Sequence, residues 1–488
     1  MLTRKDLLQA HRLGTQRAAL ALISGEPDDP ERPLRRMWVA TFCGVMVAVV
    51  VAAAFGVIGL VRPGGATGLD KAGTLIIEKE TGARYVWCVP PQSPKKLCPV
   101  ANYVSARLLA GTDEKSRRTV SRNSLTKFER GETIGIPGAP DTLPDPKALV
   151  KNPWSVCVRS ANTQRSGRVS ITTLLAGSSV GGTQLGDSQA ALVQAGQQVW
   201  MIWRNKRLSV PPYALSILNA TPTPIADRWL FSVESGAKFE APAIPNLGQQ
   251  VSRGSLSGRV GQLFTVQAAS GVSFYVLLSD GLARISEIEK ELLRADPRIK
   301  QQAYRDGVVE VAQQDPATLT GNTSAEQISN DELNAKMPSI VRYTDTASPL
   351  CAVYDDPAGN AGPRVTLGGS LPAASPDATA NSVELAFPPG SAAVAGLVSG
   401  PGRADQITTY FLVTEGQKFA FTPETAKTLG YELPANGSPV QAGVLDLIPL
   451  GPVLDPAVAQ TVMAPAAQPS AQPSQSAQPS QPAQTTPN

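Results

Sequence analysis

Residues 37–61 form an uncharged apolar run of 25 residues. A helix rises ~1.5 Å per residue, so a run of this length can cross a hydrocarbon core of ~30 Å with some tilt. The run leaves 36 residues before it and 427 after it. We therefore expect a single-pass membrane protein with nearly all of its mass on one side of the membrane.

The basic residues beside the run predict its orientation. Arg32, Arg35 and Arg36 lie just before it, whereas only Arg62 and Lys71 follow closely. Lysine and arginine are enriched on the cytoplasmic side of a span. The sequence thus predicts a plasma-membrane protein with a cytoplasmic N-terminus and an extracytoplasmic C-terminal domain.

A cleaved signal peptide is the alternative interpretation of the run. Such a peptide has an apolar core of ~7–15 residues near the N-terminus, followed by a small-residue cleavage site. Here the run is longer, starts late, and leads into Val-Arg-Pro-Gly at residues 61–64. A retained anchor is the better interpretation.

The stub before the run is predicted to form a helix. Thr3 and Asp6 have the spacing of a capping box, and Gly25 and Pro27 end the apolar periodicity. Two roles stay open for this helix. It could lie on anionic lipid through its basic residues, or it could dock a cytoplasmic partner.

Composition limits the exported part. A region of 427 residues exceeds one ordinary core, so two or more domains are expected. Gly and Pro number 42 each, which predicts frequent turns and few long helices. The net charge is +4, without a concentrated basic block, so nucleic acid is not an expected partner.

The cysteines agree with an exported domain. Cys43 falls inside the apolar run, and the other four, Cys88, Cys98, Cys157 and Cys351, all follow it. An even number in an oxidising compartment favours disulfides. A zinc site is less favoured, because no two of these cysteines are closer than ten residues and no histidine accompanies them.

The exported part contains an irregular repeat. Four segments show an apolar strand, a polar turn and a second strand, followed by a helix-like stretch. The hairpins are residues 74–85, 199–208, 273–282 and 409–419, and the helices are residues 103–109, 212–218, 285–293 and 423–429. One such unit buries little apolar surface alone, so the units are expected to pair or stack.

The resulting fold class is α+β and rich in β-structure. We expect one N-terminal transmembrane helix, then an elongated extracytoplasmic region of four hairpin-plus-helix repeats and a central β domain built from two insertions. A Cys157–Cys351 bridge would join those insertions, and Cys88 and Cys98 would close a small Pro-rich loop. The expected boundaries are a cytoplasmic helix at 1–36, the span at 37–61, a linker at 62–73, repeats at 74–145, 197–250, 251–338 and 408–460, central-domain parts at 146–196 and 339–407, and a tail at 461–488.

The tail is compositionally distinct. From Ala464 onward it is nearly all Ala, Gln, Pro, Ser and Thr. Such a segment cannot bury enough apolar surface to offset its ordering entropy, so we predict disorder and an extended path through the cell-wall zone.

A search for catalytic chemistry returns no site. Residues 177–181 match Gly-x-Ser-x-Gly, but the only histidine is His11, before the span. No Gly-x-x-x-x-Gly-Lys-[Ser/Thr] phosphate loop is present. Asp355 and Asp356 precede a glycine but lack the spacing of a calcium loop. We therefore predict no catalytic residue, no metal and no cofactor.

Charged residues on the third predicted helix are expected to form a solvated face. They are Glu287, Glu289, Lys290, Glu291 and Arg294.

Several uncommon motifs occur in one order that resembles a known family. They are residues 102–111 (NYVSARLLAG), 135–140 (GIPGAP), 154–157 (WSVC), 387–390 (FPPG), 425–431 (TAKTLGY) and 451–455 (GPVLD). Over about residues 3–460 the chain resembles EccB, the B component of the type VII (ESX) secretion machinery.

This resemblance implies one span, four extracytoplasmic repeats and a disulfide-braced central domain, which transfers to Cys157 and Cys351. It implies a membrane core complex with the C, D and E components. In that complex the C component supplies the motor ATPase. It also implies that the chain forms homo-oligomers within the complex. Some family members are labelled ATPases, so extracytoplasmic ATP hydrolysis is one alternative function. A cell-wall binding module, with contact to the wall, is the other.

Overall fold

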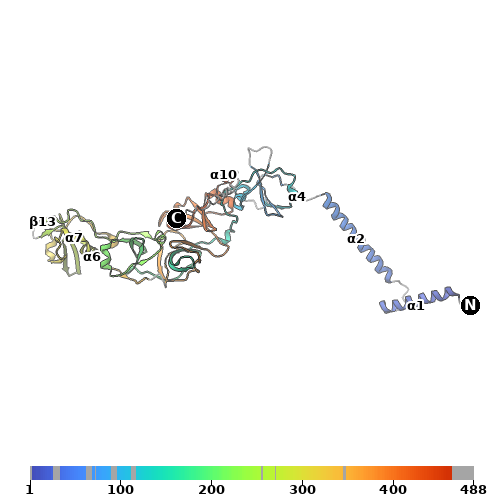
Figure 1. The fold of residues 1–488 in the computed structure, drawn as a ribbon, viewed down its shortest axis with the longest axis horizontal. Helices are drawn as coiled ribbons and strands as arrows, with labels where there is room; N and C mark the ends of the chain where they lie inside the picture. Colours follow the sequence, from blue (N-terminus) through green and yellow to red (C-terminus); the bar gives the residue numbers. More distant parts are fainter. Residues whose placement is uncertain are drawn as a thin grey trace, which may run out of the picture. The chain divides into compact units, whose positions relative to one another are not determined.

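The computed structural model describes residues 3–25, 33–61, 69–71, 73–88, 96–111, 117–253, 256–269, 271–343 and 348–463. The chain divides into two units, each described by itself. The first comprises residues 1–69, 78–81 and 119–128, and the second comprises residues 70–77, 82–118 and 129–488. Figure 1 follows the order of the elements by colour. The predicted tail from residue 464 lies outside the described residues.

Two long helices dominate the first unit. Helix α1 (Arg4–Ser24) starts after Thr3, whose backbone N–H donates to the Asp6 carboxylate at 3.0 Å, and ends at Gly25 in the left-handed region. Helix α2 (Pro33–Val61) contains an apolar stretch, Met37–Ile58, long enough to cross a membrane. This unit also holds α4 (Arg122–Leu125).

The second unit is rich in strands. The first sheet contains β1 (Leu75–Glu78), β2 (Arg84–Trp87) and β3 (Leu97–Pro99), followed by α3 (Tyr103–Ala110). Strand β4 (Arg117–Val120) is the fourth strand in the order of this sheet. Within the first unit, the Lys79 N–H donates to the Val120 carbonyl at 2.8 Å.

The next two sheets belong to neighbouring stretches of chain. The strands of the second sheet are β8 (Gln189–Ala195), β9 (Gln198–Trp203), β10 (Lys206–Val210), β11 (Thr223–Pro224), β12 (Glu234–Ser235) and, from further along the chain, β19 (Ser339–Ile340). Helix α5 (Pro212–Leu218) follows β10, and η3 (Asp227–Ser232) follows β11. The strands of the third sheet are β15 (Leu263–Ala268), β16 (Gly271–Leu278), β17 (Gly281–Ile285) and β18 (Val311–Gln314). Helices α6 (Glu287–Ala295) and α7 (Pro297–Gln302) lie between β17 and β18 in the chain. A separate hairpin, β13 (Gln250–Arg253) and β14 (Leu256–Arg259), precedes the third sheet, and η4 (Pro316–Leu319) and η5 (Asp331–Leu333) follow.

The last of these sheets lies near the end of the chain. Its strands are β23 (Ala393–Val398), β24 (Tyr410–Thr414), β25 (Gln417–Phe421) and β26 (Gly437–Gln441). The helices of this stretch are η6 (Ala404–Gln406), α8 (Pro423–Leu429), α9 (Ala442–Leu445) and α10 (Pro456–Ala459).

Three of these sheets share one topology. Three strands run as an antiparallel meander, a helix follows, and a final strand returns parallel to the first strand of the meander, as in β11 with β8, β18 with β15 and β26 with β23. The helix shares an apolar core with the strands, as Leu292 of α6 does with Val276 and Leu429 of α8 does with Leu412, and a sheet this small is not stable alone. The recurring hairpin and helix of the sequence are therefore parts of a larger motif.

A central six-stranded sheet is built from two distant stretches of chain. Its order is β22-β6-β5-β20-β21-β7. The strands are β5 (Trp154–Thr163), β6 (Gly167–Ala176), β7 (Thr183–Gln184), β20 (Leu350–Tyr354), β21 (Arg364–Leu367) and β22 (Val383–Ala386), and η2 (Pro146–Ala148) precedes them. One apolar core on this sheet includes Trp154, Trp229 and Leu350.

The small sheets share their cores in pairs. Leu192 and Trp203 of the second sheet pack in one cluster with Val276 of the third sheet and Leu292 of α6. Val104 of α3 packs in another cluster with residues of the last sheet, including Leu412. Shared cores supply the apolar burial that one small sheet lacks.

Some expected boundaries are wrong. Strand β8 was expected in the central part 146–196, and β23 in the part 339–407, but each is the first strand of a neighbouring small sheet. Strand β19 in that second part likewise pairs with β8. The tail was expected to start at 461, yet the Met463 N–H donates to the Thr133 carbonyl at 2.9 Å. The sequence patterns indicate the individual strands, but hydrogen-bonded pairing decides to which sheet each strand belongs.

Candidate functional site

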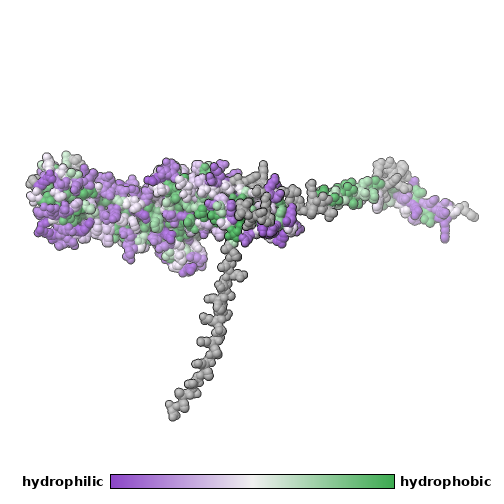
Figure 2. Space-filling view, turned by 90° about the horizontal axis from the view of Figure 1, so that it is seen from above, coloured by the Kyte–Doolittle hydropathy of each residue, from purple (hydrophilic) through white to green (hydrophobic). Residues whose placement is uncertain are grey.

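Helix α2 is the first functional element. Every described side chain from Met37 to Ile58 is exposed to the surroundings in the free chain. Figure 2 shows this helix as a continuous apolar surface. An all-round apolar helix of this length needs lipid or other spans as its environment. The orientation residue Arg32, and the side chains of Arg35 and Arg36, lie outside the described residues.

Helix α1 offers mostly exposed side chains. Its basic residues Arg4, Lys5 and Arg12 and its apolar residues Leu7 and Leu8 are all exposed. The hydrogen bond from the Thr3 hydroxyl to Asp6, at 2.6 Å, lowers the pKa of that carboxyl. The carboxylate thus stays ionised at the helix N-terminus, where a negative charge is favoured.

The Cys157–Cys351 disulfide crosses the central sheet. The two residues are directly opposite each other on the antiparallel strands β5 and β20, with Cα atoms 4.0 Å apart. Both are fully buried. Thr173 and Thr366 flank them in the same row of the sheet. The bond ties together segments 194 residues apart in sequence.

A second disulfide, Cys88–Cys98, is local. It spans ten residues of sequence and lies in the small core of the first sheet. A Cβ atom at Gly131 would lie 2.7 Å from both sulfur atoms, so only glycine fits beside this bridge. Both disulfides are structural cross-links, since the sulfur atoms are packed among apolar side chains.

The acidic candidates are satisfied by protein groups. Asp356 accepts hydrogen bonds from the backbone N–H groups of Ala358, Asn360 and Ala361 at 2.8–2.9 Å. These bonds lower the pKa of its carboxyl. This is a turn that the aspartate caps, and the described residues hold no cluster suited to a metal ion.

The Gly-x-Ser-x-Gly match is also a turn. Gly177 and Gly181 have φ of 75° and 71°, and the Ser179 hydroxyl accepts from the Gly181 N–H at 3.3 Å. Glycine at positive φ explains the spacing. His11, the only histidine of the chain, is on α1.

One expectation for the charged helix α6 is wrong. Glu289 was expected on a solvated face, but it is fully buried. Its carboxylate accepts from the Ser286 N–H, the Ser329 hydroxyl and the Asn330 N–H at 2.6–2.8 Å. The capping-box spacing after Ser286 was a signal for this role. Glu289 therefore fastens the segment after the third sheet to α6.

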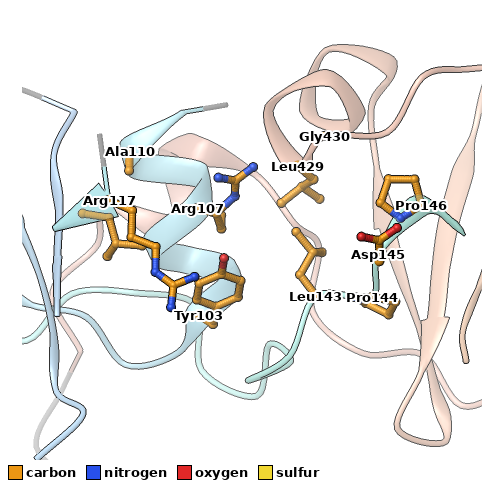
Figure 3. Close-up of a pocket in the computed structure, with 11 residues that line it drawn as sticks. Tyr103, Arg107, Ala110, Arg117, Leu143, Pro144, Asp145, Pro146, Leu429 and Gly430 are labelled. Carbon is orange, nitrogen blue, oxygen red and sulfur yellow. The ribbon is translucent and has the colours of Figure 1, made fainter. Parts of the chain in front are cut away.

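A pocket of about 460 Å³ lies between α3 and the end of α8. Tyr103, Arg107 and Arg117 line one wall, and Asp145 and Leu429 line the opposite wall (Figure 3). No sequence pattern indicates this pocket, because its residues come from separate motifs.

Taken together, these elements define a single-span membrane protein whose strand-rich region is braced by two disulfides. The family described as "Type VII secretion system ESX-1, transport TM domain B" matches residues 1–465. The chain therefore belongs to the EccB family.

Relatives and solved structures agree with this assignment. An ESX-3 secretion system ATPase EccB3 of Mycobacterium tuberculosis is 30% identical over 379 residues, which cover 72% of this chain and 66% of that protein. The chain thus matches just under two thirds of that relative's length. An ESX-1 secretion system ATPase EccB1 of the same organism is 26% identical, with 93% of each chain covered.

Two solved structures share the fold. A chain of an intact ESX-5 inner membrane complex aligns with a TM-score of 0.59 at 21% identity, covering 97% of this chain and 98% of its own. The EccB3 dimer from the ESX-3 core complex aligns with a TM-score of 0.58 at 22% identity, covering 80% of this chain and 100% of its own. The α+β, strand-rich class predicted from the sequence is confirmed.

Proposed function

We propose that this chain is a structural subunit of a type VII secretion membrane complex. The main support for this proposal is the family match over residues 1–465, which includes both the span and the disulfide-braced, strand-rich region. In this role α2 anchors the chain, α1 docks neighbouring components, and the repeats build an extracytoplasmic scaffold. The partners would be the C, D and E components and further copies of this chain.

The proposed orientation places α1 in the cytoplasm and the repeats outside the membrane. It is supported by Arg32, Arg35 and Arg36 before the span and by the two disulfides after it. The test is labelling of single introduced cysteines with a membrane-impermeant maleimide on intact cells. Ser216→Cys should label and Gln9→Cys should not, and the reverse pattern would overturn the orientation.

The ATPase name carried by relatives suggests a second function, ATP hydrolysis. We propose that this chain does not supply that activity. The sequence has no phosphate-binding loop and its Gly-x-Ser-x-Gly match is a tight turn. Nucleotide hydrolysis by the purified full chain, persisting after contaminating ATPases are removed, would contradict this.

The scaffold role is tested by exchanging the span. Replacing residues 37–58 with an unrelated apolar helix of equal length keeps the anchor but changes every side chain available to neighbouring spans. We expect the exchanged chain to reach the membrane and to recover less of the C, D and E components on affinity purification. Equal recovery of these components by the exchanged and natural chains would show that docking uses residues outside the span. Recovery of none of them by the natural chain would overturn the proposal. A cell-wall module would instead sediment with purified peptidoglycan.

A further inference from the structure

The pocket between α3 and α8 has a cationic wall whose two arginines form no ion pair within the described residues. Arg107 lies on α3 and Arg117 on β4, and both line the cavity (Figure 3). Neither has an ion-pair partner among the residues that the structure describes. Elsewhere in the chain Arg84 pairs with Asp141 at 3.0 Å and Arg122 pairs with Glu78 at 2.8 Å. This wall thus carries two guanidinium groups that no carboxylate of the described residues pairs.

The Arg107 side chain is also partly desolvated. Its Nε atom is buried and has no hydrogen-bond partner within the described part of the chain. Its Nη2 atom reaches the end of α8, since a Cβ at Gly430 would lie 3.7 Å away. A buried donor without an acceptor is costly, and an acceptor that enters the pocket would remove that cost.

The opposite wall has a different character. Asp145 accepts from the Lys147 N–H at 2.8 Å, which fixes its carboxylate at the cavity. Next to it the buried Tyr431 hydroxyl donates to the Pro144 carbonyl at 2.9 Å. Burial, with the Asp145 carboxylate, raises the pKa of Tyr431, so this hydroxyl stays protonated. The wall offers acceptors and apolar surface from Leu143 and Leu429.

We propose that this pocket binds a small molecule that carries an oxyanion and, beside it, an N–H or O–H donor. The oxyanion, a phosphate or a carboxylate group, accepts from Arg107 and Arg117, whose planar guanidinium groups match such groups in geometry. The donor faces Asp145. The volume of about 460 Å³ is in the range of small-molecule sites and exceeds what a lone ion fills.

This site is independent of the assembly role proposed above. Its residues lie on the first and last repeats of the second unit, and none is on α1 or α2. Binding could therefore fail while assembly holds, or the reverse.

The test uses the full chain in mild detergent at constant ionic strength. The probes are glycerol 3-phosphate, N-acetylglycine and inorganic phosphate, each titrated by calorimetry. We expect saturable binding of at least one of the first two, and tighter than that of inorganic phosphate. The preferred probe identifies the oxyanion, and saturable binding of neither probe overturns the proposal.

The matched variants are Arg117→Gln and Arg118→Gln. These neighbours share β4 and are both exposed, but only Arg117 lines the pocket. We expect Arg117→Gln to weaken binding at least tenfold and Arg118→Gln to leave it within twofold. Equal losses of probe affinity in the two variants would indicate a general effect of surface charge and would overturn the proposed site. Arg107→Lys, which keeps the charge but loses the planar fork, should also weaken binding without changing the fold.

A carboxylate of the chain itself is the competing occupant. Asp113 and Glu114 are close in sequence to the pocket residues but lie outside the described residues. The double variant Asp113→Asn/Glu114→Gln should bind the probes as the natural chain does. Binding that appears only in that variant would show an internally satisfied pocket and overturn the proposal.

Discussion

The central sheet and the segment after the third sheet are fastened in different ways. The central sheet joins strands 194 residues apart through the Cys157–Cys351 disulfide. The segment around residues 329–332 is fastened by two carboxylates, Glu289 and Glu332. Glu289 reaches only 40 residues along the chain to Ser329. The Lys206–Glu332 contact spans 126 residues. Since loop-closure entropy grows with loop length, the covalent bond closes a more costly loop than either carboxylate does.

The largest effect should follow removal of the long-range disulfide. In the chain-entropy model a loop of this length contributes roughly 5 kcal/mol, so Cys157→Ala/Cys351→Ala should strongly destabilise the central sheet. The measurement is urea unfolding followed by fluorescence of the buried Trp154 and Trp229. An unchanged midpoint would show that the sheet's apolar core suffices without the bond.

The local disulfide should matter less. Its ten-residue separation corresponds to roughly 3 kcal/mol in the same model. Cys88→Ala/Cys98→Ala should increase hydrogen exchange in β1–β3 while leaving β5 and β20 protected. Loss of protection across the central sheet as well would remove the distinction between a local and a long-range cross-link.

The buried carboxylate should rank third. Glu289→Ala leaves the Ser286 N–H, the Ser329 hydroxyl and the Asn330 N–H without their acceptor, at a cost of about 2–3 kcal/mol. Glu287→Ala, at an exposed position on the same helix, is the control and should be near neutral. Equal thermal midpoints for the two variants would show that the hydrogen bonds of Glu289 do not stabilise the fold.

The smallest effect is expected at Glu332. The hydrogen bond from Lys206, helped by the Ala237 N–H, lowers the pKa of its carboxyl. Because the pKa of Glu332 is lower in the folded chain than in the unfolded chain, where it is ~4.3, the ionised carboxylate stabilises the fold at pH values above the unfolded pKa. This stability is lost as the pH falls through the folded-state pKa. Because the carboxylate is 38% exposed, the contribution should stay below ~1 kcal/mol.

The measurement is the difference in thermal midpoint between the natural chain and Glu332→Gln from pH 7 to pH 3. We expect it to be positive at pH 7 and to vanish at the acid end. Glu326→Gln, exposed and nearby, is the control. A difference that grows toward acid pH would contradict the assigned sign.

The elements predicted from the sequence are those fixed by local patterns. The four hairpins and their helices occur within a few residues of their expected positions, because turn residues and apolar alternation act over short distances. Strand β3 was not predicted, since it is only three residues long and follows a Pro-rich loop. Strands β8 and β23 were assigned to the wrong sheets because their partners depend on tertiary packing.

The candidate sites divide in the same way. The capping role of Asp6 follows from spacing, whereas the burial of Glu289 depends on residues 329 and 330, forty positions away. The Arg107–Arg117 wall looks like ordinary surface charge in the sequence. Only the packing of α3 against the last repeat turns it into a cavity.

The native mass of the assembly decides whether this chain is a structural subunit of a secretion complex. The full chain should be extracted from its own membranes in mild detergent and analysed by native electrophoresis with mass spectrometry of each band. We expect one large assembly that contains several copies of this chain with the C, D and E components. Migration as a lone monomer without these partners would contradict the account.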